Sequence, residues 1–417
     1  MNKDSIKLYF HNLLYTISSE LRAVFLDEGV FLIVILAPII YATIYSSVYG
    51  TQVLRDVPVG VVDMSKTPTS RQLTQMIDLG PNTKVAYTPT DMEDARQLFF
   101  DKKIYSILYI PSSFERDLLG GDGTNVALYL DASYMLMYRQ AFEEMAASIS
   151  TFGAEVEYSD LIAQGADTPQ ALELTQPVIY QSHTLFNPYI GYGTFIMPPV
   201  IMLILQQTLL IGIGMLSGTR RERATLLSSL SSHSPFLTLF VRVVVYFSIY
   251  AILLYYLLNV HYKAFNYPIN GAISTIVIFL AIYLIACILF ALAASSLFHR
   301  RESPLMLFLW TSIPLLMLSG VSYPHQAIPE WMRLFSYIFP STFGAGGFVK
   351  IATNGASLNE VLPEIKSLAI LIIIYLYASY FSIDSPSKKH HIISEEKRKP
   401  PTLLHRPPNA PPKPNMI

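Results

Sequence analysis

Long apolar runs alternate with shorter polar stretches along most of this chain of 417 residues. A helix that crosses a bilayer needs roughly 20 apolar residues to span a hydrocarbon core about 30 Å thick. Six runs reach or approach that length: Val30–Tyr49, Phe195–Leu216, Phe236–Leu258, Gly271–Phe298, Pro304–Gly320 and Ser367–Ile383. The pattern predicts an α-helical polytopic membrane protein with six transmembrane helices, one at 30–49 and five within 193–383.

The composition agrees with a membrane location. Hydrophobic residues make up 52% of the chain and charged residues only 14%, whereas soluble proteins carry about 25% charged residues. The net charge of −1 gives no bias toward nucleic acid, so membrane lipids and not nucleic acid are the expected surroundings. The single cysteine, Cys287, excludes an intramolecular disulfide framework and a zinc site built from cysteines.

Basic residues indicate the orientation of the spans, because Lys and Arg gather in short cytoplasmic loops. With the N-terminus in the cytoplasm, most basic flanks lie inside, among them the cluster at 220–223 and the pair at 300–301. The outer loops then carry only Lys263, Arg333, Lys350 and Lys366. We therefore expect a multi-pass protein with both the N- and the C-terminus in the cytoplasm.

The segment 1–29 has the period of an amphipathic helix. Apolar residues recur at steps of three and four from Ile6 to Phe25, with polar residues between them. Beside a span, such a helix is expected to lie in the membrane interface with its apolar face down. The sequence leaves two interpretations open: a simple anchor, or a lateral elbow helix that also contacts a cytoplasmic partner.

Residues 50–192 are mostly polar and alternate between strand and helix patterns, which predicts an α/β extracytoplasmic domain inserted between the first and second spans. The expected strands are 57–62, 84–87, 104–110 and 126–130, with a possible fifth at 177–184. Four helices are expected. One begins at Pro68 and one at Tyr134, and capping boxes at 90–93 and 112–115 mark the starts of the other two.

This domain is acidic. Between residues 51 and 190 there are 9 Lys and Arg against 18 Asp and Glu. A solvated surface and a face that attracts cationic substrates or a partner both fit this charge. No spaced pair of carboxylates and no accompanying histidine marks a catalytic or metal site, so we expect no catalytic residues and no bound metal.

The chain lacks the sequence features of an energy source. No G-x-x-x-x-G-K-[ST] phosphate loop is present. The glycine cluster at 344–347 lacks the Lys-Ser/Thr end and is expected to form a turn. No charged residue lies at the middle of a predicted span, where proton- or ion-coupled carriers commonly place one. We therefore expect the chain to hold no cofactor and to draw energy from another polypeptide.

Several uncharged features in and near the spans have two interpretations. Gln206 and Gln207 need partners in hydrocarbon, either on a neighbouring helix or in a translocation path. A helix at 329–338 is expected on the outer membrane interface, where it would form a possible outer gate. Its apolar face consists of Trp331, Leu334, Phe335 and Ile338. The tail 384–417 is basic and proline-rich, and it is expected to be a disordered cytoplasmic segment.

Several motifs occur in an order that resembles a known family. They are Val59-Gly-Val-Val-Asp-Met-Ser-Lys66, Ile110-Pro-Ser-Ser-Phe114, Phe186-Asn-Pro188, Gly218-Thr-Arg-Arg-Glu-Arg223, Leu318-Ser-Gly-Val-Ser-Tyr-Pro324, Ile328-Pro-Glu-Trp331 and Phe339-Pro-Ser-Thr342. Together with the single large domain after the first span, they resemble the type-2 export permeases of ATP-binding cassette (ABC) transporters. Within that family, the chain is most similar to multidrug-efflux permeases of the bacterial inner membrane with a large periplasmic domain.

The resemblance implies a set of partners. ATP and Mg²⁺ would be bound by a separate cytoplasmic ATPase, and a second permease subunit, identical or a close paralogue, would complete the path. A periplasmic membrane fusion protein commonly accompanies such permeases. The loop after the second span would present a polar knob to the ATPase. This coupling segment comprises Gly218, Thr219, Arg220, Arg221, Glu222 and Arg223.

Two other functional classes remain as alternatives. A cell-envelope receptor or secretion scaffold of the phage-infection-protein type also has a large outer domain after its first span, although that domain is usually much longer. An intramembrane enzyme needs paired polar catalytic residues in its spans, and the predicted spans contain none. Transport of a small amphiphilic or drug-like molecule, or of a lipid, is therefore the favoured function.

Overall fold

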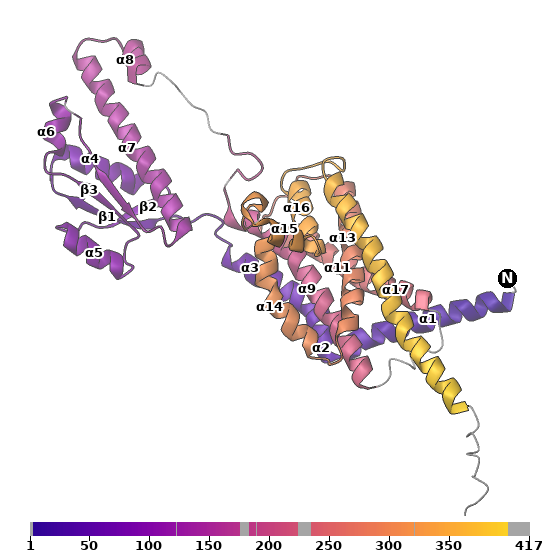
Figure 1. The fold of residues 1–417 in the computed structure, drawn as a ribbon. Coiled ribbons are helices and arrows are strands. Elements are labelled where there is room, and N and C mark those ends of the chain that lie inside the picture. The colour runs from indigo at the N-terminus through magenta and orange to yellow at the C-terminus, as the bar shows by residue number, and fades with distance from the viewer. Residues whose placement is uncertain are drawn as a thin grey trace, which may run out of the picture. The chain divides into compact units, whose positions relative to one another are not determined.

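The polar stretch after the first apolar run folds separately from the apolar helices. The computed structural model describes residues 3–121, 123–175, 183–188, 190–223, 235–320 and 322–398, without the side chains of residues 3–12 and 382–398. Its elements form two units (Figure 1). Thr51–Thr184 form one, here the sheet unit, and Met1–Gly50 with Leu185–Ile417 form the other, here the membrane unit.

The sheet unit contains one four-stranded sheet in the order β2-β1-β3-β4. Its strands are β1 (Val57–Asp63), β2 (Thr83–Tyr87), β3 (Ser106–Ile110) and β4 (Ala127–Leu130). Its helices are α4 (Pro68–Leu79), α5 (Met92–Phe100), α6 (Phe114–Leu119), α7 (Met135–Ala163) and α8 (Thr168–Thr175). Strand β1 pairs in parallel with β2 and β3, and β4 runs antiparallel to β3. The four strands lie where the alternating pattern predicted them, and every strand end is within two residues of its predicted position.

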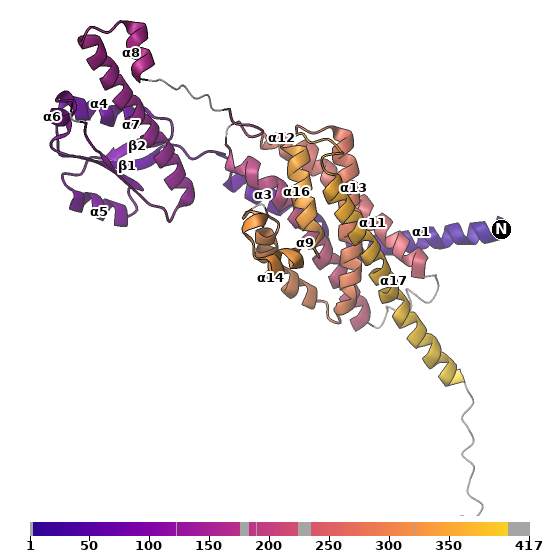
Figure 2. The ribbon, with the colours of Figure 1, turned by 45° about the horizontal axis from the view of Figure 1, so that its top comes forward.

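Alternation along the strands gives the sheet two apolar faces. Val59 and Val61 of β1 pack toward α4 and α7, whereas Val62 packs toward α5. Figure 2 shows α5 on the side of the sheet opposite to α4 and α7. Because successive side chains of a strand point to opposite faces, one apolar strand contributes to both cores.

Two predicted helix caps in the sheet unit were wrong. Helix α5 is capped by Asp91, not by Thr90, because the Asp91 carboxylate accepts from the backbone N–H groups of Glu93 and Asp94. The Ser112–Glu115 pair forms no capping box, since Glu115 instead accepts a hydrogen bond from Thr69 Oγ1 on α4. Helix α8 was not predicted, and nearly all of the possible strand at 177–184 lies outside the described residues.

Within its described residues, the membrane unit has five helical stretches that are long and apolar enough to cross a bilayer. They are Glu28–Val48, Tyr192–Glu222, Pro235–Ala264, Ile273–Leu297 and Leu362–Phe381. The fifth predicted run forms α14 (Ser303–Leu318), which is shorter than the others. At 1.5 Å per residue, its 16 residues extend about 24 Å, less than the hydrocarbon core. The sixth crossing therefore stays a prediction.

The elements of the membrane unit follow one another in this order. They are α1 (Lys3–Leu26), α2 (Glu28–Phe31), η1 (Leu32–Leu36), α3 (Ala37–Val48), α9 (Tyr192–Glu222), α11 (Pro235–Tyr256), η2 (Leu257–His261), α12 (Tyr262–Ala264), α13 (Ile273–Ala294), η3 (Ser295–Leu297), α14, η4 (His325–Ala327), α15 (Glu330–Ser336), α16 (Pro340–Ala352) and α17 (Leu362–Arg398). The amphipathic helix expected before the first span is present as α1.

Helix α9 is the centre of the membrane unit. Nearly all of its side chains from Thr194 to Gly218 are buried, and it packs against α3, α13, α14 and α16. Figures 1 and 2 both show it among these helices. A helix that is apolar on all sides is buried on all sides. Glycines on α9 permit close approach: a Cβ at Gly214 would lie 2.7 Å from Pro304 of α14.

The glycine cluster at 344–347 is part of a helix, so the predicted turn was wrong. These residues lie inside α16, which packs on α13. A Cβ at Gly344 would lie 2.2 Å from the Tyr283 ring, and one at Gly347 would lie 2.3 Å from the Phe279 ring. The glycines therefore serve helix packing, where small residues let two membrane helices approach.

The helical part of the chain extends further than predicted at the C-terminus. Helix α17 continues to Arg398, so residues 384–398 are not part of an irregular tail. Seven of the eight tail prolines lie at position 400 or later, and residues 387–399 contain neither Pro nor Gly. Only Pro386 lies within the extension, and the lack of Pro and Gly after it favours continuation of the helix. Residues 399–417 lie outside the described residues, and disorder there stays a prediction.

Substitution of Gly347 tests the packing of α16 on α13. Gly347→Ala places a methyl group against the Phe279 ring, so we expect the unfolding free energy to fall by about 1–3 kcal/mol. Gly346→Ala is the matched control, because nothing lies within 4 Å of its Cβ position. That change should raise the free energy by up to about 1 kcal/mol through helix propensity. Unfolding in mixed micelles measures both, and equal effects would contradict the packing.

Candidate functional site

The basic cluster is the last turn of α9 and not a separate knob. The apolar run was predicted to stop at Leu216, but the helix continues to Glu222, and Arg223 is its C-cap. The side chains of Arg220 and Arg221 are therefore carried rigidly by the central helix. The rest of the loop between the second and third spans, residues 224–234, lies outside the described residues.

Glu20 of α1 lies at the centre of the contacts made by this end of α9. Glu20 is only 5% exposed. Arg220 Nη2 donates to Glu20 Oε2 at 2.6 Å, and the Tyr246 hydroxyl of α11 donates to Oε1 at 3.2 Å. Arg242 Nε, also on α11, lies 3.7 Å from Oε2. One buried carboxylate thus joins α1, α9 and α11.

The charge state of Glu20 follows from these neighbours. Burial on its own would raise the pKa of Glu20, because a charged carboxylate loses hydration. The positive charges of Arg220 and Arg242 outweigh this effect, aided by hydrogen bonds from Arg220 and Tyr246, and the pKa falls below its usual value. Glu20 is therefore an anion at neutral pH.

Arg221 and Gly218 join α9 to the segment between α13 and α14. Arg221 Nη1 donates to the backbone oxygens of Ser296 and Phe298, at 2.6 and 2.7 Å. These oxygens lie at the end of α13 and η3, where helix carbonyls lack intrahelical donors. Gly218 touches the same segment, since a Cβ there would lie 2.6 Å from the Arg300 oxygen. A side chain larger than glycine would separate the two segments.

Arg301 completes the connection to the first span. Its guanidinium donates from two nitrogens to the two carboxylate oxygens of Asp27 and also to Thr219 Oγ1. Its backbone N–H donates to Glu222 Oε1 at 3.0 Å. The hydrogen bond from Arg301 is the main cause that lowers the pKa of Asp27. Asp27 also caps α2 through the Val30 N–H.

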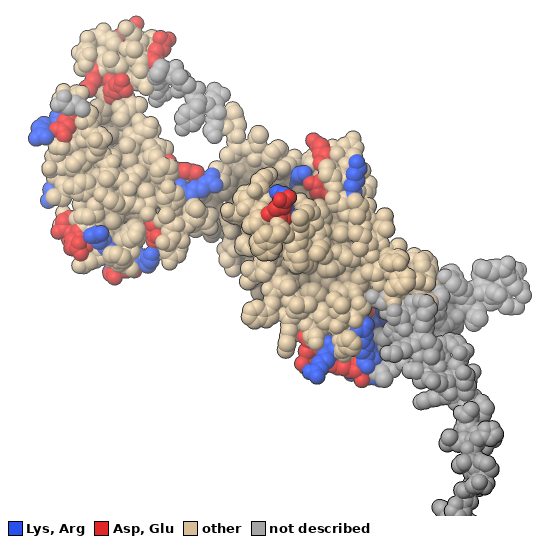
Figure 3. Space-filling view, viewed as in Figure 1, with Lys and Arg blue, Asp and Glu red and all other residues tan. Residues whose placement is uncertain are grey.

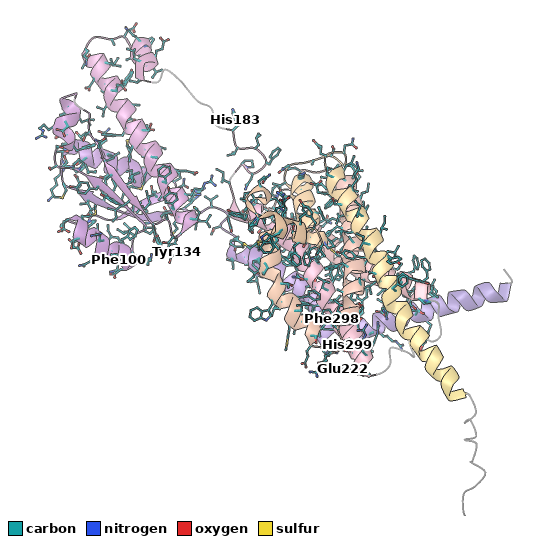
Figure 4. All side chains as sticks on the ribbon, in the orientation of Figure 1. Phe100, Tyr134, His183, Glu222, Phe298 and His299 are labelled. Carbon is teal, nitrogen blue, oxygen red and sulfur yellow. The ribbon has the colours of Figure 1, made fainter. Side chains whose placement is uncertain are left out.

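These contacts form one network at one end of the membrane unit. We call it the arginine-end network; its members are Glu20, Asp27, Thr219, Arg220, Arg221, Glu222, Arg242, Tyr246 and Arg301. Figure 3 shows charged side chains gathered at both ends of the membrane unit, with few on the visible surface between them. Figure 4 places Glu222 at the same end as Phe298 and His299.

The six residues predicted for coupling thus divide by position. Gly218 and Thr219 make packing and hydrogen-bond contacts, and Arg220 and Arg221 are held by partners inside the chain. The side chains of Glu222 and Arg223 are exposed. A docking role for the segment stays a prediction, and the structure leaves these last two residues at the surface for it.

Sequence reasoning missed the residues that hold the cluster in place. Glu20 follows Leu13 and Ile17 at helical spacing and precedes Val24, so it is an acid within the apolar face of α1. Arg242 lies inside the third apolar run. The acid on the apolar face of α1 and the base inside the third apolar run were the available signal for a buried pair, because hydrocarbon excludes unpaired charges.

Gln206 and Gln207 both make contacts between helices. Gln206 Oε1 accepts from the backbone N–H of Ser341 in α16 at 2.7 Å. Gln207 Nε2 donates to the Ser312 hydroxyl at 3.1 Å and to the Phe308 oxygen in α14. Both side chains are buried. These bonds fit the helix-packing interpretation, and a role in a translocation path stays a prediction.

The helix predicted at 329–338 is shorter than expected. Helix α15 covers Glu330–Ser336, so Ile338 lies beyond its end, because the chain turns there into α16. All four residues of the predicted gate, Trp331, Leu334, Phe335 and Ile338, are exposed in the single chain. Their exposure fits contact with lipid or another chain, and a gate stays a prediction.

Comparison with known proteins decides the family. A family described as "ABC-2 family transporter protein" matches residues 29–381. The chain belongs to the ABC-2 transporter family. It is similar to the "Probable multidrug ABC transporter permease YbhR" of Escherichia coli strain K12 and to the protein of the same name in E. coli O157:H7. Each is 20% identical over 366 residues, which cover 87% of this chain and 95% of the relative.

Membership of the ABC-2 family agrees with the apolar helices in showing a multi-pass membrane protein. Proteins of this family are transporter permeases and are not themselves enzymes. An ABC-2 permease implies an ATP-binding cassette partner. The match begins at Gly29, so α1, which supplies Glu20 and ends one residue before Asp27, precedes the matched range.

Removal of the Glu20 charge tests the arginine-end network. Glu20→Gln leaves Arg220 and Arg242 buried without a counter-charge, and such a break costs about 3–5 kcal/mol. We expect that loss in the unfolding free energy measured in mixed micelles. Glu28→Gln is the matched control, since Glu28 is exposed and lies two residues past the end of α1. A loss below 1 kcal/mol for Glu20→Gln would contradict the network.

Proposed function

We propose that this chain is the membrane-spanning permease subunit of an ABC exporter. It moves a small amphiphilic or drug-like molecule, or a lipid, out of the cytoplasm or the inner membrane. ATP is hydrolysed by a separate ATPase in the cytoplasm. The name of the E. coli relatives, a probable multidrug permease, supports this substrate class, and the ABC-2 family supports the ATPase partner.

The arginine-end network is the observation that carries the proposal. It connects the end of α9 to α1, α2, α11 and the junction of α13 and α14 through charged hydrogen bonds. The exposed Arg223 lies one residue beyond the helix. A force applied there by a partner protein is therefore delivered to several helices together, which is what a coupling site requires.

Rigidity distinguishes a coupling element from a simple membrane anchor. Lys and Arg that only hold a helix end at the interface extend into headgroups and water. Arg220 and Arg221 instead donate to Glu20 and to backbone oxygens within the chain. Because these bonds fix the last turn of α9, movement of that turn displaces the elements bonded to it. The exposed ATPase contact would then consist of Glu222 and Arg223.

The proposal includes an orientation and an assembly. The arginine end and both termini face the cytoplasm, and the sheet unit lies in the periplasm. Two permease subunits, identical or paralogous, pair above two ATPase subunits, and a periplasmic membrane fusion protein receives the substrate. The positive flanks of the spans support the orientation, and the exposed apolar side chains of α14 leave surface for lipid or a second subunit.

Charge reversal at Arg223 tests the coupling role. The permease is reconstituted in liposomes with its partner ATPase, and ATP hydrolysis is measured with and without permease. We expect Arg223→Glu to reduce the permease-dependent hydrolysis at least tenfold, equivalent to about 1.4 kcal/mol of lost contact. Permease without ATPase should release no phosphate.

The matched control is Lys366→Glu, which makes the same charge change on an exposed residue at the start of α17. This residue is predicted on the outer side, so hydrolysis should be unchanged. Insertion of each variant is checked by its yield in the membrane fraction. Unchanged hydrolysis with Arg223→Glu, or an equal loss with Lys366→Glu, would contradict docking at the arginine end.

A further inference from the structure

The membrane unit contains a cavity that the coupling function does not use. Its volume is about 600 Å³, within the range of about 300–1,000 Å³ that holds drug-sized ligands. Its walls come from α3, α9, the end of α14, the segment that leads into α15, and Met332 of α15 itself. Helix α9 contributes its first residues here and its last residues to the arginine-end network, so the two sites lie at opposite ends of one helix.

The lining of the cavity is apolar with a few hydroxyl groups. Four tyrosines and one serine line it, namely Tyr45, Tyr49, Tyr192, Tyr323 and Ser322, and the other lining residues are aliphatic, Met or Pro. None of the described lining residues carries a charge. A charged ligand group would lose hydration without gaining a counter-charge here. The lining therefore favours an uncharged molecule with an aromatic or aliphatic body and few polar groups.

The cavity has a buried floor and an exposed rim. Ile196 and Val200 of α9 are 6% and 5% exposed, whereas Tyr45 and Tyr323 are 43% and 53% exposed. Aromatic rings at the rim can pack against the faces and edges of a flat ligand, and their hydroxyls can bond to its polar end. Entry from the rim and enclosure at the floor suit an amphiphilic shape.

Two of the wall residues flank the sheet unit in the sequence. Tyr49 lies two residues before that unit begins, and Tyr192 opens α9 after it ends. Their rings contact each other edge-to-face, with centroids 5.0 Å apart. Asn187 secures the second segment, because its side chain donates to the Gly191 oxygen and accepts from the Gly191 N–H. A ligand in the cavity would touch both segments that connect the two units.

We propose that this cavity is a binding site for small uncharged amphiphiles with aromatic character, formed within a single chain. The assignment rests on the proposed function, since it names the class of molecule that the exporter takes. A pair of permeases then holds two such sites. Occupation of the site places the ligand against Tyr49 and Tyr192, at the boundary of the sheet unit in the chain.

Two dyes that differ by one charged group test the site. N-phenyl-1-naphthylamine is neutral, and 1-anilinonaphthalene-8-sulfonate carries the same rings with a sulfonate. The reporter is energy transfer from Trp331, which neighbours the lining residue Met332, in a Trp310→Phe background that leaves it as the only tryptophan. The chain is placed in nanodiscs of dioleoylphosphatidylcholine. We expect saturable binding of the neutral dye and at least tenfold weaker binding of the sulfonate.

Variants locate the binding. Val200→Phe fills the buried floor and should weaken binding of the neutral dye at least tenfold, whereas Val277→Phe makes the same change on an exposed face of α13 and should leave it within twofold. A second route avoids any folding defect. Ser322→Cys places a thiol at the exposed rim, and the native Cys287 is buried. A bulky maleimide on that thiol should block the dye, and the dye should slow the labelling.

The outcomes separate this inference from the proposed function, because binding is measured without ATPase. Equal binding of the two dyes, or equal effects of the two valine substitutions, would overturn the site even where Arg223→Glu abolishes coupled hydrolysis. Saturable binding in detergent that disappears in nanodiscs would show a lipid as the occupant and would also overturn it. Selective binding without any ATPase coupling would leave the site standing and refute the exporter.

Discussion

The membrane unit depends on one buried carboxylate. Glu20 lies between Arg220 and Arg242, with a hydrogen bond from Tyr246; Glu20, Arg242 and Tyr246 are buried, and the Arg220 side chain is only 15% exposed. Burial of any one charge alone costs several kcal/mol, so each member needs the others. This mutual requirement fixes the position of α1 along α9 and α11, because Glu20 must lie beside Arg220 and Arg242. Arg221 and Arg301 extend the same constraint to the α13–α14 junction and to the first span.

Helix α9 connects the arginine-end network to the other end of the membrane unit. Its 31 residues extend about 46 Å, from Tyr192 at the apolar cavity to Arg220 and Arg221 in the arginine-end network. Between these ends the helix is buried and bonded to its neighbours through Gln206 and Gln207. The cavity and the arginine-end network thus share one continuous, close-packed helix. Coupling at one end and a ligand at the other would therefore act on the same element.

The sequence predicted those features that depend on local pattern. Apolar runs located the five spanning-length helices of the described residues, although the last run, Ser367–Ile383, was itself short, and alternating valines located β1. Features that depend on distant partners were not predictable in this way. The glycines of α16 were predicted to form a turn. Their actual role is to make room for the rings of Phe279 and Tyr283, which lie some 60 residues earlier in the sequence. Arg220 and Arg221 were predicted to form a polar knob. The pattern could not show their partners Glu20, Ser296 and Phe298, because these are remote in sequence. Thr90 was predicted to cap α5, because both Thr90 and Asp91 are suitable cap residues and only the backbone geometry shows that Asp91 is the cap.

The most direct measurement of the central claim is a double-mutant cycle between Glu20→Gln and Arg220→Gln, with unfolding free energies measured in mixed micelles. If the last turn of α9 is clamped through Glu20, the double variant loses less than the sum of the single losses, by about 1–3 kcal/mol. If Arg220 instead acts as an independent anchor at the membrane surface, the two losses add to within about 0.5 kcal/mol. Additive losses would contradict the account.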